Sequence, residues 1–206
     1  MAFTTLLFDL ETFSEQAKFR FDDPTLKIIS IQYKDVSNGN ITILKEWESD
    51  EVTILTNFYE SLKEIRKAGN LQLIGHNILR FDIPLLLHRM VLQEIDSNVA
   101  LLYFFHETFT VDTYQCVFPF NRCRFKGLAA EDLAKILETR GPKHHGSQIP
   151  EFYKQKLYDK IDEHVRSDLD FIEDLWQILT ANQNKLKERL NESPWECETR
   201  IKKGAL

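Results

Sequence analysis

The first quarter of the chain contains short apolar runs of the kind that form β-strands. Residues 4–7 are apolar and β-branched, residues 26–33 alternate between apolar and polar positions, and residues 41–47 return to the same character. Between the last two runs, residues 37–40 read Ser-Asn-Gly-Asn, and Asn-Gly is the strongest short-range hairpin signal. The pattern therefore predicts three strands joined as a meander.

Residues 50–68 change to the spacing of an amphipathic helix, and Gly69 supplies a C-terminal stop. The apolar positions that carry this period are Val52, Leu55, Phe58, Tyr59, Leu62 and Ile65. The remaining predicted elements are strands over 72–75 and 109–115, and helices over 81–93, 126–138 and from 150 to about 190. This order predicts one α/β domain over residues 1–190, a mixed five-stranded sheet flanked by helices, and a poorly ordered tail over residues 191–206.

Composition agrees with one globular domain and limits its location. Of 206 residues, 43% are hydrophobic and 28% are charged, which is ordinary for a soluble protein. No apolar run approaches the roughly 18 residues of a membrane helix, and the N-terminus lacks a signal-peptide pattern. We therefore expect a cytoplasmic, or at least intracellular, protein without membrane contact. The three cysteines include no C-x-x-C pair, so neither a zinc site nor a disulfide framework is indicated.

The net charge of −6 limits which binding partners we expect, nucleic acid in particular. Proteins that bind nucleic acid broadly tend to carry a basic surface, which this balance argues against weakly. An enzyme that holds a nucleic-acid end through metal ions is still allowed, because bound cations reverse the local charge.

The first candidate site follows the opening strand, in the sequence Phe-Asp-Leu-Glu-Thr at residues 8–12. Side chains two positions apart lie on the same face of a strand, so Asp9 and Glu11 project together while Leu10 points the other way. Two adjacent carboxylates repel each other unless a cation lies between them. Mg²⁺ or Mn²⁺ would suit such oxygen ligands, whereas a solvated acidic strand end is the alternative for an isolated pair.

Two later stretches offer further acidic groups. Asp82 lies near the start of a predicted helix, where the helix dipole favours a negative charge, and it follows a polar turn at Asn77. His164 and Asp168 are four residues apart in a predicted helix and so share one face. Each has a plain structural alternative: a first-turn acid for Asp82, and a solvated helical pair for His164 and Asp168.

Together these stretches resemble the DEDD superfamily of 3′→5′ exonucleases, whose fold is ribonuclease H-like. Residues 8–12 are similar to its first motif, D-x-E. Residues 76–86, H-N-I-L-R-F-D-I-P-L-L, are similar to the second motif in the form found in proofreading domains of family B DNA polymerases. Residues 164–168, H-V-R-S-D, are similar to the third motif. The resemblance covers about residues 3–180.

The resemblance implies a two-metal site with two Mg²⁺ or Mn²⁺ ions. Asp9, Glu11 and Asp168 would hold the ion that activates water, Asp9 would bridge to a second ion, and Asp82 would support that second ion through water. His164 would orient or deprotonate the attacking water, which suits a histidine near neutral pH. One branch of the superfamily has Tyr four residues before the last Asp and another has His five before it. Here a histidine, His164, stands four residues before Asp168. It combines the residue type of the second branch with the spacing of the first.

Substrate contacts are also implied by the resemblance. Leu10 through its backbone and Thr12 through its hydroxyl match positions that contact the terminal nucleotide, and Asn77 matches a residue that contacts the strand. Phe81 is either a base-stacking residue or a core aromatic. Lys143 lies in the cationic loop 140–146, which either contacts the substrate strand or is simply solvated.

The function expected from these residues is a stand-alone, metal-dependent 3′→5′ exonuclease. It would be stand-alone because 206 residues are too few to include a polymerase as well. The resemblance to polymerase proofreading domains implies that it acts on single-stranded DNA and releases nucleoside monophosphates. RNA trimming is the nearest alternative, since nothing in the sequence reads the 2′-hydroxyl. A non-catalytic nucleic-acid-binding module of the same fold is the alternative from another class, and the intact set of four carboxylates argues against it. Asp112, in Thr-Val-Asp-Thr-Tyr, is expected to be structural.

Overall fold

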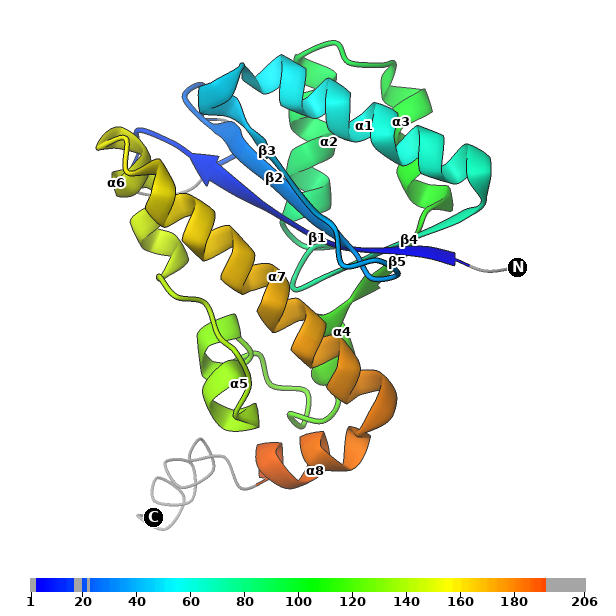
Figure 1. Ribbon diagram of the computed structural model, residues 1–206, viewed down its shortest axis with the longest axis vertical. Coiled ribbons are helices and arrows are strands. Elements are labelled where there is room, and N and C mark those ends of the chain that lie inside the picture. The colour runs from blue at the N-terminus through cyan, green and yellow to red at the C-terminus, as the bar shows by residue number, and fades with distance from the viewer. Residues whose placement is uncertain (1–2, 17–19, 22, 192–206) are drawn as a thin grey trace, which may run out of the picture.

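The computed structural model describes residues 3–16, 20–21 and 23–191 of the chain, which fold around one five-stranded sheet (Figure 1). The strand order is β3-β2-β1-β4-β5. On one side of the central strand β1 (Phe3–Phe13) lie β2 (Lys27–Asp35) and β3 (Ile41–Lys45), which continue from it as an antiparallel meander. On the other side, β4 (Asn70–Gly75) and β5 (Phe109–Asp112) run parallel to it. The prediction of a mixed, five-stranded α/β sheet is confirmed.

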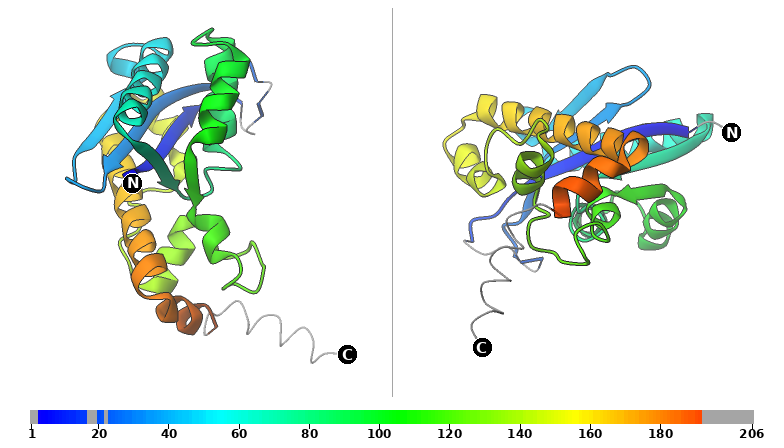
Figure 2. Two further views of the ribbon diagram at one scale, coloured as in Figure 1. Left: turned by 90° about the vertical axis from the view of Figure 1, so that its right-hand side faces the viewer. Right: turned by 90° about the horizontal axis from the view of Figure 1, so that it is seen from below.

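Helices cover both faces of this sheet (Figures 1 and 2). The first face carries α1 (Glu51–Ala68), α2 (Asp82–Leu92) and α3 (Asn98–Glu107). The second face carries α4 (Thr113–Val117), α5 (Ala130–Leu137), α7 (Tyr158–Ala181) and α8 (Gln183–Asn191). The short helix α6 (Ile149–Lys154) packs with α7 near the end of β1, and two 3₁₀ turns occupy Glu46–Glu48 and Gly146–Gln148.

The alternation along β1 decides which residues enter which core. Leu6, Phe8 and Leu10 are buried in the core beneath α1, α2 and α3. Leu7 is buried in the opposite core with residues of α7. Because the period of a strand is two residues, Asp9 and Glu11 follow Leu7 on the α7 face. The sheet thus directs the acidic pair toward the longest helix of the protein.

Several predicted boundaries are confirmed with their causes. Asp50 caps α1, since its side chain accepts a hydrogen bond from the Thr53 amide at 2.7 Å, and Gly69 ends the helix. The turn between β2 and β3 contains Gly39 at φ +74°, the left-handed conformation that an Asn-Gly turn needs.

Other predicted boundaries are wrong. The fifth strand ends at Asp112 instead of 115, because the Asp112 carboxylate accepts from the Tyr114 amide and starts α4. The third strand ends at Lys45 instead of 47, and the helix expected from 126 begins at Ala130. The long late helix is interrupted at 155–157 and at Asn182. The helix α3 is not among the predicted elements, although Ser97 caps it with its hydroxyl.

Two expectations concern the surroundings of the domain. Within the described residues, no helix is both long and apolar enough to cross a membrane. The predicted tail begins at the end of α8, and its residues 192–206 lie outside the described part of the chain.

Candidate metal centre

Asp9 and Glu11 lie side by side on the α7 face of β1, as the strand period predicts. Gln32 on β2 is paired with Asp9 across the sheet, and its amide nitrogen donates to Asp9 Oδ2 at 2.5 Å. Ser30 in turn donates to the Gln32 side-chain oxygen at 3.0 Å. Directly after Glu11 the β1–β2 register shifts by a bulge, which re-aims side chains at sites of this kind. A buried polar chain on β2 therefore orients the first carboxylate.

Asp82 is the first residue of α2 and is 4% exposed. Its Oδ1 accepts a hydrogen bond from the Leu10 amide at 3.3 Å, which joins α2 to the acidic strand. The approach between β4 and β1 here depends on Gly75. A Cβ at that position would lie 2.3 Å from the Ile78 side chain and 2.5 Å from the Phe8 carbonyl oxygen. Glycine therefore allows the turn that delivers Asp82 to the site.

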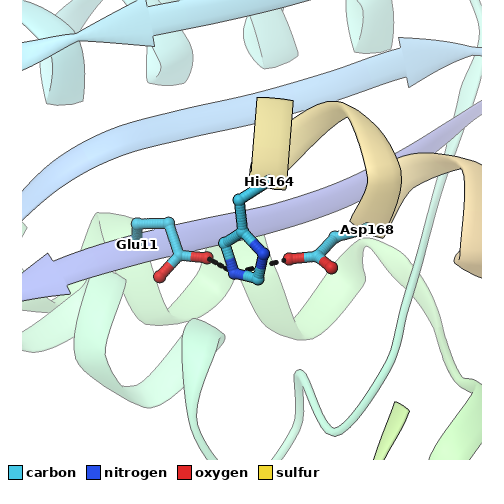
Figure 3. A group of neighbouring side chains, drawn as sticks. All are labelled: Glu11, His164 and Asp168. Atoms are coloured by element: carbon cyan, nitrogen blue, oxygen red, sulfur yellow. Dashed lines mark ion pairs between the residues drawn. The ribbon is translucent and has the colours of Figure 1, made fainter. Parts of the chain in front are cut away.

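His164 and Asp168 project from α7 toward Glu11 (Figure 3). The His164 Nε2 atom lies 3.1 Å from Glu11 Oε1 and 3.1 Å from Asp168 Oδ2. The histidine is 3% exposed, so the alternative of a solvated helical pair is wrong for it. The spacing of four residues places the imidazole between two carboxylates, one from the sheet and one from its own helix.

The four carboxyl groups strongly resist ionisation in this arrangement. Burial, followed by the charge of Glu11, raises the pKa of Asp9 to about 7. Burial raises the pKa of Glu11 to about 8. Burial and then the charge of Asp9 raise the pKa of Asp168 to about 9, and the same two causes hold the pKa of Asp82 well above its usual range. Each group is thus held in a place that disfavours its negative charge unless a cation is added.

The donor set fits a hard divalent cation. One ligand atom each from Glu11, His164 and Asp168 lies within 4.8 Å of the others. Asp168 Oδ1 and His164 Nδ1 are buried and have no hydrogen-bond partner among the described residues. Buried polar atoms are normally paired, so these two have unused capacity to bind. Carboxylate oxygens suit Mg²⁺ or Mn²⁺ better than a soft metal.

A pocket of about 160 Å³ opens at the carboxylates. It is lined by Asp9, Glu11, His76, Ala130, Glu131, Pro142, Gly146, His164, Asp168, Phe171 and Ile172. None of these described lining residues is a lysine or an arginine, so none of them brings a permanent positive charge to the pocket.

Some residues of this site were not identified from the sequence. Gln32 carried one signal, a lone amide among the apolar residues of the second strand. His76 precedes the predicted Asn77 and lines the pocket, where its ring is fixed by the Leu128 carbonyl at 2.8 Å and the Thr113 hydroxyl at 3.0 Å. Glu131 is brought to the pocket by α5. Only tertiary structure relates these last two residues to the acidic strand.

The predicted strand-contacting residues lie around the same turn. Asn77 has a left-handed backbone (φ +67°), its amide donates to Asp112 at 2.8 Å, and its buried side-chain oxygen has no partner among the described residues. Phe81 is half-buried against the core, as its structural alternative predicts. Thr12 is half-buried just past the bulge. Asp112, which also accepts from the Leu79 amide at 3.1 Å, has the expected structural role.

Lys143 lies at the rim of the α7 face. Its backbone amide donates to Ser167 Oγ at 2.9 Å, and its ammonium group pairs with Glu163. The neighbouring Arg140 forms ion pairs with Asp170 at 2.9 Å and with two further acids of α7. Part of the predicted cationic loop is therefore neutralised by the helix on which it rests.

Comparison with known proteins identifies the fold. No protein-family model and no curated protein matches the chain. Among solved structures, it is similar to the family B DNA polymerase from the hyperthermophilic archaeon Pyrobaculum calidifontis, with a TM-score of 0.61 and 19% sequence identity. The match covers 92% of this chain and 27% of the polymerase chain, so this chain spans about a quarter of that protein. The five-stranded sheet with flanking helices and this structural match are consistent with the expected ribonuclease H-like fold.

Proposed function

We propose that this protein is a metal-dependent 3′→5′ exonuclease that hydrolyses single-stranded DNA to nucleoside monophosphates. The observation that carries the proposal is the meeting of four carboxyl groups and one histidine, from three distant segments, in one buried place. All four carboxyls have raised pKa values, and no described lysine or arginine lines the pocket that Asp9, Glu11 and Asp168 share. Buried carboxyl groups with raised pKa values are found mainly at functional sites, since their burial lowers the stability of the fold. The likeness to a DNA polymerase chain supports a nucleic-acid substrate.

The residues divide into two groups by position. Glu11 and Asp168, with Asp9 beside them, would hold one Mg²⁺ or Mn²⁺ ion, and Asp82 would help Asp9 to hold a second. When bound, such a pair of ions lowers the pKa of water and neutralises charge on the leaving oxygen. The protein's contribution is to hold the ligands in place, through Gln32 on Asp9 and the Leu10 amide on Asp82.

His164 would move the proton of the attacking water. Its Nε2 lies 3.1 Å from Glu11 Oε1 and 3.1 Å from Asp168 Oδ2, so the two carboxylates fix the position of the ring. General-base assistance of this kind contributes about a hundredfold to ten-thousandfold in rate. The plain alternative, a histidine that only neutralises buried acids, predicts no such dependence of turnover on the ring.

End recognition would come from the residues around the acidic strand. The pocket of about 160 Å³ is small beside the roughly 300–1,000 Å³ of ordinary small-molecule sites. It would therefore hold the reacting phosphate and its immediate neighbours, while Thr12 and the Leu10 backbone contact the terminal nucleotide and Asn77 contacts the strand beside it. Lys143, whose side chain is 59% exposed, would reach the strand only by exchanging its Glu163 partner for a phosphate.

The decisive experiment compares DNA and RNA strands of one sequence, each labelled at the 5′ end, with Mg²⁺ or Mn²⁺. We expect a ladder of products that shortens from the 3′ end of DNA, and its loss in Asp9→Ala. Glu64→Gln, which removes an exposed carboxylate from α1, serves as the matched control and should leave the ladder unchanged. A ladder on RNA alone would move the proposal to RNA trimming. Absence of digestion of both strands by the wild-type protein with either metal would refute the enzyme.

A further inference from the structure

The segment that connects α4 to α5 differs in charge from the rest of the protein. We call residues 118–129 the aromatic–basic loop: it contains Arg122, Arg124 and Lys126 together with Phe118, Phe120 and Phe125. No aspartate or glutamate occurs between residues 113 and 130, although the chain has 32 acidic residues and a net charge of −6. A cationic surface of this kind on an acidic protein indicates a local polyanion partner.

The loop has a defined shape. Asn121 is 8% exposed, and its side-chain nitrogen donates to the carbonyls of Arg124 at 2.6 Å and Lys126 at 3.0 Å. Arg122 and Cys123 both have a left-handed backbone, at φ +53° and +55°. Two consecutive non-glycine residues in this conformation are costly, and such strain is concentrated at functional positions. The buried Asn121 thus holds a strained turn that projects the next residues outward.

Phe125 is the outermost ring of an aromatic cluster. It is 59% exposed, and its ring stacks on Phe118 with centroids 4.6 Å apart. Tyr114 lies nearly parallel to it at 6.2 Å and donates its hydroxyl to the Phe125 carbonyl. The guanidinium of Arg80, from the turn before α2, lies 5.3 Å from the Phe125 centroid. Arg124, also exposed, pairs with no acidic side chain among the described residues.

The cluster is continuous with the candidate metal centre. The Tyr114 ring lies 5.4 Å from the ring of His76, which lines the carboxylate pocket. The far end of the loop is fixed to the same histidine through the Leu128 carbonyl, and Ala130 immediately after the loop also lines the pocket. Only the rings of His76 and Tyr114 therefore separate the carboxylate pocket from Phe125. A strand whose end lies at the carboxylates would pass the aromatic cluster.

We propose that the aromatic–basic loop and Arg80 form a docking surface for single-stranded nucleic acid upstream of the reacting 3′ end. Bases would stack on the exposed part of the Phe125 cluster, and the cations beside it would meet the phosphates. Such a surface is tolerant of sequence, because every base has a face that can stack. The inference rests on the proposed function for its substrate. It adds the place where the strand is held and makes chain length, rather than sequence, the determinant of affinity.

Nucleic acid fits this surface better than an acidic peptide. Both would be attracted by the cations, but only bases make full use of an exposed, nearly parallel aromatic stack. The two occupants differ in a measurable way. Removing Phe125 should weaken binding of a nucleic acid greatly and binding of a polyglutamate peptide little.

The test measures binding without cleavage, by fluorescence anisotropy in EDTA. The probe is a labelled oligothymidine of about twelve nucleotides, within the usual range of single-strand site sizes. Phe125→Ala should weaken binding about tenfold without changing the dependence on salt, and Phe125→Trp should restore it. Arg124→Glu should instead reduce the slope of log affinity against log salt, by about 0.7 for each phosphate that the variant no longer neutralises.

Matched controls are available on the opposite helical layer. Tyr103→Ala removes an aromatic residue that is 64% exposed on α3, and Lys67→Glu reverses an exposed charge on α1. Neither should alter affinity. Wild-type affinity in both Phe125→Ala and Arg124→Glu would overturn the proposal, as would undetectable binding by the wild type or an equal loss of oligothymidine and polyglutamate affinity in Phe125→Ala. A protein that binds through the loop but digests nothing would refute the exonuclease and leave the docking surface standing.

Discussion

Asp9→Asn should make the metal-free protein more stable at pH 8, although it removes an acid from the centre of the site. The replacement keeps the size of the side chain and can still accept the hydrogen bond that Gln32 donates. It removes a charge that the surrounding protein opposes. Burial and the neighbouring Glu11 raise the pKa of Asp9 from 3.8 to about 7.

The sign and size of the effect follow from this shift. At pH values well below 3.8 the carboxyl is protonated in both the folded and the unfolded chain. As the pH rises toward 7, the unfolded chain releases the proton and the folded protein retains it, so the free energy of unfolding falls. Above that pH the loss is constant, at roughly 4 kcal/mol for a shift of this size. Asparagine has no proton to release, so the variant avoids most of that loss.

Urea unfolding followed by tryptophan fluorescence measures the difference. In EDTA at pH 8 we expect Asp9→Asn to exceed the wild type by about 2–4 kcal/mol, with the gap closing toward pH 4. Mg²⁺ at a thousandfold excess over Kd should remove this difference, because such an excess adds about 4.1 kcal/mol to the protein that binds it. Glu64→Gln controls for loss of an exposed acid. If Asp9→Asn is no more stable than the wild type at pH 8, the site does not oppose the negative charge of Asp9 and the argument for a cation fails.

Three further expectations concern chemistry, packing and metal affinity. His164→Gln should lower kcat by about a hundredfold or more while the Kd for a single strand measured in EDTA stays the same; unchanged turnover would make the ring structural. Gly75→Ala should cost about 1–3 kcal/mol in urea unfolding, since its Cβ would press on Ile78 and the Phe8 carbonyl, whereas Gly69→Ala, with nothing within 4 Å, should cost less. Mn²⁺ affinity measured by calorimetry should rise between pH 6 and 9, because protons leave carboxyls with pKa values of about 7 to 9 over that range.

Local periodicity predicted those pairs of site residues that lie on the same strand or the same helix. The two-residue period of a strand places Asp9 and Glu11 together, and the four-residue spacing of a helix places His164 with Asp168. The structure has both pairs as expected, and the two pairs meet where His164 lies 3.1 Å from Glu11. Composition and patterning likewise predicted the sheet, because each strand had its own apolar run.

Contacts between elements could not be predicted in the same way. The hydrogen bond from the Leu10 amide to Asp82 joins residues 72 positions apart, and no periodicity links them. His76 reaches the pocket only because Thr113 and Leu128, from other segments, fix its ring. For the carboxylates, the resemblance of three motifs indicated which distant segments lie together. It assigned no role to His76, although the second stretch, residues 76–86, begins with this histidine.

The wrong start of α5 shows how a small boundary error can hide an exposed loop. A helix from residue 126 would place Lys126 and Gly127 in its first turn and leave Phe125 as a flanking residue. In the structure, Gly127 has a left-handed backbone at φ +83° and the chain does not become helical until Ala130. The extra turn is stabilised by Asn121, whose side chain donates to the carbonyls of Arg124 and Lys126. A helix from residue 126 would have used the second of these carbonyls internally. Side-chain competition for backbone groups thus converts a predicted helix start into a loop that presents an aromatic ring and its cations beside the acidic pocket.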